Sequence, residues 1–263
     1  MKNLQKNIVL ILLFAVSISC NNGKQEHHKA VFNKENTKDF IPENQTDRIK
    51  VAFLIYPEIA ILDMTGPMDA FIKINRMTKN QYEVYTVSET KDMITTQGHI
   101  LEIRADYVFE EAPKPDIFII PGAKVDKVEA MVEKTVYAQY IQETSAKANI
   151  TMSVCTGSFA LGKLGILDGK KATTHWILSN KFEDDFKKTE LVRNVRYVKD
   201  GNIITTSGVT TGIDGAIAII SKYSSPDFAA MISRGLQYET KSVDQWPKLP
   251  SKPMKHGDSS PID

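Results

Sequence analysis

The sequence predicts an α/β fold whose mostly parallel sheet carries helices on both faces. Short runs of β-forming apolar residues alternate along the chain with helical segments, and this alternation is typical of parallel sheets. The runs are almost wholly apolar, as in Asp116–Ile120 (DIFII), where every residue after Asp116 is apolar; this indicates strands that are buried on both faces. The chain has 263 residues, of which 42% are hydrophobic and 25% charged, so its composition is globular and its length allows a sizeable core.

The strands and helices are expected in alternating order. The first strand covers Lys50–Tyr56, and a helix is expected to open at Gly66-Pro67, because proline is tolerated at the first helical position. Further strands are expected at Tyr82–Val87, Ile94–Ile103 (a pair with a turn at Gly98), Asp116–Ile120, Ile150–Val154, Ala172–Thr174, Val192–Val198 and Asn202–Thr206. Further helices are expected at Val125–Lys147, Ser158–Leu164, Ile213–Tyr223 and Asp227–Gln237, the last capped around Ser225.

The N-terminus predicts an export signal over residues 1–19. Lys2 and Lys6 precede the apolar stretch Ile8–Ile18, which is shorter than the roughly 20 residues of a membrane-spanning helix. The small Ser19 stands directly before Cys20, as in a bacterial lipoprotein signal. Cys20 is therefore expected to be lipidated as the first residue of the mature protein, with a plain signal peptide or an uncleaved anchor as the alternative.

The rest of the chain divides into a tether, one domain and a tail. Residues 20–48 are polar and charged, which is typical of a flexible tether. Residues 49–239 form the folded domain, and residues 240–263 form a polar tail. The protein is expected to be a membrane-anchored lipoprotein that faces the periplasm or the cell exterior.

The charge balance gives no sign of a nucleic-acid partner. The chain carries 33 Lys and Arg residues against 32 Asp and Glu residues, a formal net charge of +1. Nucleic-acid-binding domains usually show a basic face or stripe. We therefore expect a small-molecule substrate and a membrane contact through the lipid, and no nucleic acid.

Chemically useful residues follow three of the expected strands. Asp63 comes after the first strand, Pro121-Gly122-Ala123 follows Asp116–Ile120, and Cys155 follows Ile150–Val154. Ligand sites of parallel α/β sheets lie beyond the carboxyl ends of the strands. The sequence therefore predicts a site where these segments meet.

Cys155 occupies the corner between a strand and a helix, which is the arrangement of a nucleophile elbow. The free N–H groups at a helix start stabilise a thiolate and a negative charge that develops on the substrate. With Cys20 lipidated, Cys155 has no intramolecular disulfide partner. From spacing alone, an inert buried cysteine is an equally good interpretation.

Several blocks in this chain resemble the DJ-1/ThiJ/PfpI family of the class I glutamine amidotransferase-like superfamily. They are Val51–Pro57 with Ile61–Pro67 (ILDMTGP), Ile119–Gly122 (IIPG), Val154–Leu161 (VCTGSFAL), Gly165–Trp176 (GILDGKKATTHW) and Ile204–Asp214 (ITTSGVTTGID). The blocks keep their order across residues 50–238. The first block, the Thr after the cysteine and the TTHW segment resemble most the isonitrile hydratase branch and the N-terminal domains of AraC-type regulators.

The resemblance implies a flavodoxin-like fold, a homodimer and a reaction that needs no metal or organic cofactor. It implies that Cys155 is the nucleophile, Thr156 its polar neighbour and Asp63 an acid on the loop after the first strand. In the family a histidine at the position of His175 lies close to the cysteine, so His175 is a second base or an orienting group.

The backbone N–H groups of Gly122, Ala123 and Thr156 are the predicted oxyanion hole. Many relatives have Gly-Gly where this chain has Gly122-Ala123, and the extra methyl narrows the approach of a substrate. An Asp63 beside a thiolate is expected to have a raised pKa, because two negative charges repel each other. A protonated Asp63 would then hold the Cys155 thiolate and act as general acid and base.

The predicted function is hydration of a small electrophile, an isocyanide by analogy, to an N-substituted formamide. Glyoxalase, deglycase and peptidase activities at the same cysteine are alternatives, because one fold hosts many reactions. A non-catalytic module that senses oxidants or binds a ligand is an alternative of a different class.

Overall fold

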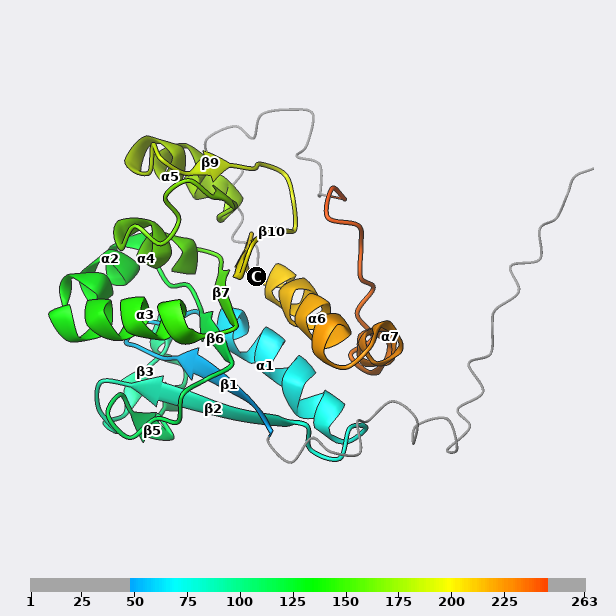
Figure 1. Ribbon diagram of the computed structural model, residues 1–263. Coiled ribbons are helices and arrows are strands. Elements are labelled where there is room, and N and C mark those ends of the chain that lie inside the picture. Colours follow the sequence, from blue (N-terminus) through cyan, green and yellow to red (C-terminus); the bar gives the residue numbers. More distant parts are fainter. Residues whose placement is uncertain (1–47, 246–263) are drawn as a thin grey trace, which may run out of the picture.

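A seven-stranded sheet forms the centre of the computed structural model, which describes residues 48–245 (Figure 1). The strand order is β10-β11-β7-β6-β1-β2-β5, and every neighbouring pair is parallel except β10 and β11. The strands are β1 (Ile49–Leu54), β2 (Tyr82–Ser88), β5 (Tyr107–Val108), β6 (Ile117–Ile120), β7 (Ile150–Val154), β10 (Tyr197–Asp200) and β11 (Ile203–Thr206). The predicted mostly parallel sheet is confirmed.

Helices cover both faces of this sheet, as Figure 1 shows. One face carries α1 (Ile61–Asn75), α6 (Thr211–Tyr223) and α7 (Pro226–Gly235), and the other carries α2 (Val125–Glu133), α3 (Thr135–Lys147) and α4 (Gly157–Lys163). The short helix α5 (Ser179–Asp185) lies beside β9 (Glu190–Leu191), which pairs with β8 (Lys171–Ala172) in a separate two-stranded sheet. A hairpin of β3 (Ile94–Thr95) and β4 (Glu102–Ile103) completes the fold.

The core lies between the sheet and its two helical layers. Every residue of β6 and β7 is buried, as the continuous apolar runs of their sequences predict. Phe53 and Phe118 have no exposed surface, and burial of each such side chain stabilises the fold by about 1.5–3 kcal/mol. The central strands are therefore a rigid support for whatever follows their carboxyl ends.

Helix α1 begins earlier than predicted. It starts at Ile61 instead of Gly66, and Pro67 stands inside it. A proline within a helix removes one backbone donor, so here the carbonyl of Asp63 loses its helical partner. Packing offsets this cost, since Pro67 is buried close to Gly212 of α6. As a consequence, Asp63 lies in the first turn of α1 and not on a loop.

Other predicted boundaries were also wrong. The predicted helix Val125–Lys147 is two helices, because Lys134 takes an extended conformation between α2 and α3. Of the predicted strand Val192–Val198, only the last two residues are in a strand, because β9 ends at Leu191 and β10 begins at Tyr197. The predicted strand Ala172–Thr174 shares only Ala172 with the short strand β8. β5 and α5 were missed because they have two and seven residues and weak periodicity. The Ser225 cap is confirmed, since its side chain accepts a hydrogen bond from the Phe228 N–H.

The predicted signal peptide, Cys20, nearly all of the tether and most of the tail lie outside the described residues. Between residues 48 and 245, no helix is long and apolar enough to cross a membrane. In that same part of the chain, no three His, Cys, Asp or Glu side chains gather as metal ligands would.

Candidate active site

Cys155 stands at the sharp turn between β7 and α4. Its φ is +57°, a left-handed conformation that is uncommon for a non-glycine residue and costs on the order of 1–3 kcal/mol. The turn is held by backbone bonding: the Cys155 N–H donates to the Thr206 carbonyl (3.0 Å), and the Cys155 carbonyl accepts from the Ser158 hydroxyl (2.9 Å). Cys155 is half-buried, and the Thr156 N–H donates to its sulfur. The predicted strand-to-helix elbow is therefore present.

Asp63 reaches this sulfur from the first turn of α1. Its carboxyl group hydrogen-bonds to the Cys155 thiol, and the residue is 1% exposed. Two backbone groups hold it there: the Val209 N–H donates to Oδ1 (2.8 Å), and the Gly122 N–H donates to Oδ2 (3.2 Å). Four segments that follow the carboxyl ends of β1, β6, β7 and β11 thus meet at one carboxyl–thiol pair.

The electrostatics of the pair differ in part from the prediction. Burial raises the pKa of Asp63, although the Val209 and Gly122 N–H groups oppose this shift. Burial also raises the pKa of Cys155, and the nearby charge of Asp63 raises it further, while the Thr156 N–H lowers it only in part. The raised pKa of Cys155 favours the thiol over the predicted resting thiolate. Asp63 is placed to accept the thiol proton.

Thr156 is bound to the neighbouring loop. Its hydroxyl donates to the Ala123 carbonyl (2.6 Å) and accepts from the Ala123 N–H (3.0 Å). The Thr156 side chain also interacts with the Cys155 thiol and lowers its pKa, so the one hydroxyl proton is shared between the Ala123 carbonyl and the sulfur. The structure places Thr156 beside the cysteine, but as a clamp between the elbow and the loop after β6.

The N–H groups predicted to form an oxyanion hole are already paired. Gly122 donates to Asp63, Ala123 donates to Thr156, and the Thr156 N–H faces the sulfur. An oxyanion could accept hydrogen bonds from the Gly122 and Ala123 N–H groups only by displacing the oxygens of Asp63 and Thr156. In this structure these N–H groups hold the acid and the clamp, and their role toward a substrate stays a prediction.

His175 lies near the site without joining it. It is half-buried, and its ring packs against the Trp176 ring at a centroid separation of 6.1 Å. Burial lowers the pKa of His175. Within residues 48–245, no hydrogen bond links its side chain to Cys155; the neighbouring Thr174 hydroxyl reaches the Cys155 carbonyl instead (3.4 Å).

Sequence reasoning missed the turn after β11. Gly208 has φ +108°, and a Cβ there would lie 2.7 Å from the Cys155 sulfur, so only glycine fits. The next residue, Val209, supplies the shorter of the two N–H bonds to Asp63. The glycine inside the SGVTTG run at a strand end was the available signal.

Tyr56 is a second missed residue. It is fully buried, and its hydroxyl donates to the Pro121 carbonyl (2.7 Å), which braces the loop that carries Gly122. Burial raises the pKa of Tyr56 well above its ordinary value, and the charges of Asp63 and Cys155 add to the shift. Tyr56 is therefore neutral and acts as a brace.

Asp214 lies in the first turn of α6 but does not cap that helix. Its carboxylate pairs with the Arg196 guanidinium at 2.6 Å, and both side chains are buried. The first turn of α6 is thus tied to the segment before β10 and not to its own N–H groups.

The residues next to the site present apolar surface. Leu62 precedes Asp63, Val209 bonds to Asp63, and Trp176 follows His175; their exposed fractions are 41%, 44% and 47%. Large exposed apolar side chains next in sequence to site residues, or bonded to them, favour ligands with an apolar body.

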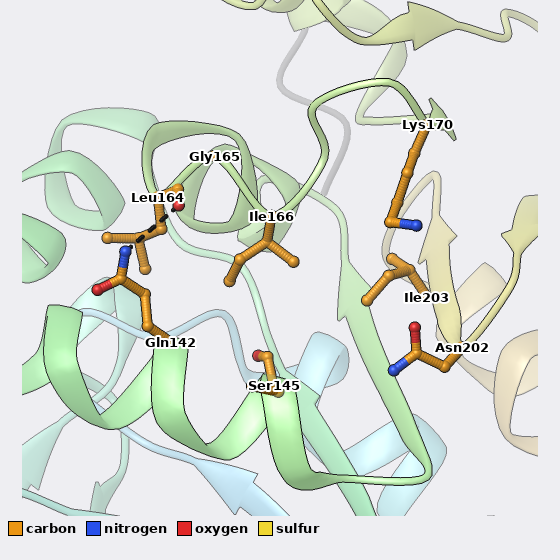
Figure 2. A pocket seen from close by; sticks show the side chains of 9 residues that line it. Gln142, Ser145, Leu164, Gly165, Ile166, Lys170, Asn202 and Ile203 are labelled. Atoms are coloured by element: carbon orange, nitrogen blue, oxygen red, sulfur yellow. Dashed lines mark hydrogen bonds between the residues drawn. The ribbon is translucent and has the colours of Figure 1, made fainter.

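A separate cavity of about 330 Å³ lies at the other end of the sheet (Figure 2). Ser145 of α3, Ile166 and Lys170 of the loop after α4, and Ile203 at the start of β11 line it. Since Ile203 begins β11 whereas Cys155 follows the end of β7, this cavity is remote from the carboxyl–thiol pair. None of the predicted site residues lines it.

Replacing Gly122 with alanine is expected to open the site and to lower the reactivity of Cys155. A Cβ at this position would lie 2.5 Å from the Thr156 hydroxyl and 2.7 Å from Asp63 Oδ2, so the acid and the clamp must both move. We expect catalytic turnover to fall about 100-fold or more, as for misplaced catalytic groups. Steady-state kinetics of the variant test this, with Gly235→Ala as the control for a glycine change, because nothing lies within 4 Å of a Cβ at Gly235 and its φ is not positive. Wild-type kinetics for Gly122→Ala would contradict it.

Comparison with known proteins places this fold among named relatives. Residues 49–222 match the model of the DJ-1/PfpI family. The chain is 31% identical over 192 residues to an isonitrile hydratase of Pseudomonas putida, covering 72% of this chain and 78% of that protein. It is 23% identical over 183 residues to the HTH-type transcriptional regulator CdhR of Pseudomonas aeruginosa, covering 69% of this chain and 52% of the regulator.

Solved structures agree in fold. A THiJ/PfpI family protein from Pseudomonas syringae superposes with a TM-score of 0.65 at 25% identity, covering 74% of this chain and 77% of that one. Drosophila melanogaster DJ-1beta superposes with a TM-score of 0.64 at 17% identity, covering 74% of this chain and all of that one (100%). The predicted flavodoxin-like fold and the predicted family resemblance are both confirmed.

Proposed function

Because this chain belongs to the DJ-1/PfpI family, we propose that its carboxyl–thiol pair hydrates a small apolar isocyanide to an N-substituted formamide. The observation that carries the proposal is the hydrogen bond between the buried Asp63 carboxyl group and the Cys155 thiol. The 31% identity to an isonitrile hydratase supports the choice of substrate.

The reaction uses the proton of the Cys155 thiol. Asp63 takes the thiol proton as the Cys155 sulfur bonds to the terminal carbon of the isocyanide, and it then delivers that proton to the same carbon. The product is a thioimidate in which the carbon is bonded to sulfur, to hydrogen and, doubly, to nitrogen. The raised pKa of Asp63 suits it to both steps, because its carboxyl group holds and releases a proton closer to neutral pH.

Water completes the cycle. Asp63 removes a proton from water as the oxygen adds to the thioimidate carbon, and the nitrogen receives that proton. The carbon–sulfur bond then breaks, the new hydroxyl becomes the formamide carbonyl, and its proton returns through Asp63 to the sulfur. One water is consumed for each isocyanide, and the thiol is restored.

The exposed apolar side chains around the pair favour a hydrocarbon substituent on the isocyanide. Leu62, Trp176 and Val209 offer contact surface and no charge. We further propose that the enzyme acts at a membrane surface, since the residues before the domain have the form of a lipoprotein signal ending at Cys20. An enzyme at that position would meet substrates that arrive from outside the cell.

The alternative of a redox sensor has less physical support. Peroxide oxidises the thiolate, and sensor cysteines have a low pKa and are accessible. Burial and Asp63 raise the pKa of Cys155, which leaves little thiolate at neutral pH. A ligand-binding role without turnover stays the second candidate, because the chain is also similar to part of a transcriptional regulator.

The test is turnover in ¹⁸O-labelled water. We expect the full-length protein to convert cyclohexyl isocyanide into N-cyclohexylformamide that carries one ¹⁸O, as read by mass spectrometry. Methylglyoxal, a simple amide and a peptide are run beside it. Formamide without label, or turnover of methylglyoxal or peptide alone, would overturn the proposal. Saturable binding of the isocyanide with no product would favour the ligand-binding role.

A further inference from the structure

A cluster of two buried side chains and one half-buried side chain lies behind the turn that holds Asp63. It consists of Arg196 before β10, Asp214 in the first turn of α6, and Tyr238 after α7, and we refer to it as the Arg–Asp–Tyr cluster. The Arg196 Nε and Nη2 donate to Asp214 Oδ2 at 2.8 and 2.6 Å, and the Tyr238 hydroxyl lies 2.7 Å from the same oxygen. Arg196 Nη2 also donates to the Tyr238 hydroxyl. The cluster therefore joins three segments that are distant in sequence.

Two members of the cluster, Arg196 and Tyr238, also hydrogen-bond to the backbone of the turn Ser207–Thr210. The Ser207 N–H donates to the Arg196 carbonyl (3.0 Å). The Tyr238 hydroxyl shares its one proton between Asp214 Oδ2 (2.7 Å) and the Thr210 carbonyl (3.2 Å). The turn is therefore anchored at both ends by members of the cluster. Between these anchors lies Val209, whose N–H donates to Asp63.

This turn needs outside support. Gly208 and Val209 both have positive φ, at +108° and +53°. A β-branched residue pays a steric penalty in that region, on the order of 1–3 kcal/mol, and keeps it only where the surroundings fix the backbone. The short bonds between Gly208 and Thr211 close the turn internally, but they do not set its position relative to Asp63.

We propose that Arg196, Asp214 and Tyr238 are positioning residues, which hold the Ser207–Thr210 turn so that the Val209 N–H stays on the Asp63 carboxylate and Gly208 stays against the sulfur. The inference rests on the proposed function only for its catalytic consequence. The positioning of the carboxyl–thiol pair does not depend on which substrate the site binds. None of the three residues touches Asp63 or Cys155 directly, so each acts through the turn.

The charges near the pair make the effect of this positioning measurable. Within the described residues, the ionisable groups that interact with Asp63 are Cys155, across the site, and Tyr56, after β1. Tyr56 is neutral, because burial raises its pKa well above the ordinary value. The Val209 N–H opposes the raised pKa of Asp63. Loosening the turn therefore lets Asp63 keep its proton to a higher pH.

Tyr238→Phe tests the proposal with a small change. It removes the hydroxyl that bonds to Thr210 and Asp214 and leaves the ring that packs near the Arg196 guanidinium, 6.0 Å from its centroid. The readout is the pH dependence of Cys155 alkylation by iodoacetamide, followed by mass spectrometry of the Cys155 peptide of the full-length protein. We expect the midpoint of the transition at lower pH in this profile to rise by about one pH unit. A shift of that size corresponds to the free energy of a weakened hydrogen bond to a carboxylate.

Tyr82→Phe is the matched control. Its hydroxyl is hydrogen-bonded to Ser224 (2.8 Å), but it lies at the start of β2, away from the carboxyl ends of the strands. A purely structural role for Tyr238 predicts that both variants lower the melting temperature and leave the alkylation midpoint unchanged, which would overturn the proposal. A midpoint that rises only in Tyr238→Phe supports it.

The two proposals fail in different ways. If the wild type shows no isocyanide turnover while the alkylation midpoint still rises in Tyr238→Phe, the proposed function is wrong and the positioning role stands. If turnover is present and the midpoint of Tyr238→Phe equals that of the wild type, the positioning role is wrong and the proposed function stands. In an active enzyme, we expect the Tyr238→Phe effect to fall on kcat and not on KM, since the turn contacts the reacting pair.

Discussion

Replacing Cys155 with alanine is expected to reduce isocyanide hydration by about 10⁴-fold or more, because no other group can form the carbon–sulfur bond. Alanine keeps the backbone at the same strained φ of +57°, so the elbow and its bond to the Thr206 carbonyl are retained. The measurement is single-turnover kinetics with excess protein, combined with circular dichroism to show that the variant is folded.

The chain offers a matched control for this change in its other cysteine. Cys20→Ser changes the other cysteine, which precedes the predicted domain of residues 49–239, and the purified variant is expected to keep full turnover. A Cys155→Ala variant that hydrates isocyanides at the wild-type rate would remove the sulfur from the mechanism. Asp63 and a bound water would then have to account for the reaction.

Replacing Asp63 with asparagine is expected to lower kcat about 10³-fold and to abolish the acidic limb of the pH–rate profile. The amide cannot accept the thiol proton or return it. Asparagine also has one acceptor oxygen where Asp63 uses two, so one of the N–H groups of Val209 and Gly122 faces an NH₂ group. Steady-state rates measured across the pH range test this, and a variant that retains the acidic limb would assign that limb to another group.

The same substitution has a pH-dependent effect on stability. The pKa of Asp63 in the folded protein is raised above its ordinary value of 3.8, mainly by burial, so ionising it costs folding free energy. That cost is absent below pH 3.8 and appears as the pH rises through the raised pKa. The asparagine side chain of the variant cannot ionise, so the free energy of unfolding of the wild type should fall relative to that of Asp63→Asn over this window.

Urea unfolding at several pH values measures this difference, with Asp69→Asn as the control. Asp69 lies on the same helix in an exposed pair with Lys73, and such pairs contribute about 0–1 kcal/mol. We expect no comparable pH trend for Asp69→Asn over the same range. An equal trend in both variants would show that the burial of Asp63 is not its cause.

The strand-level features of this protein could be predicted from the sequence. Fully apolar runs such as Ile117–Ile120 and Ile150–Val154 are short, rich in β-formers and end at Pro or at the elbow, so local composition decides them. Cys155 was predicted at the corner for the same reason. Asp63 was identified as the acid through the family resemblance. Its place in the first turn of α1 was missed because Gly66-Pro67 predicts a helix start after it.

The contacts of the site could not be predicted in this way. Val209 is an apolar residue in a turn, and nothing in its local sequence indicates that its N–H donates to a carboxylate 146 positions away. Likewise, Ala123 and Thr156 meet because β6 and β7 are neighbours in the sheet, and their mutual hydrogen bonds use the groups that sequence reasoning assigned to a substrate.

By itself, the sequence determined the class of fold, the order of most elements and the identity of the cysteine and its acid, since these depend on local periodicity and on recognisable residue types. The tertiary structure alone decided the ionisation of the pair, the pairing of the loop N–H groups and the placement of the Arg–Asp–Tyr cluster. Proton affinity depends on burial and on charges within a few ångströms, and those distances are set by which strands lie side by side, a property that no segment of the chain carries alone.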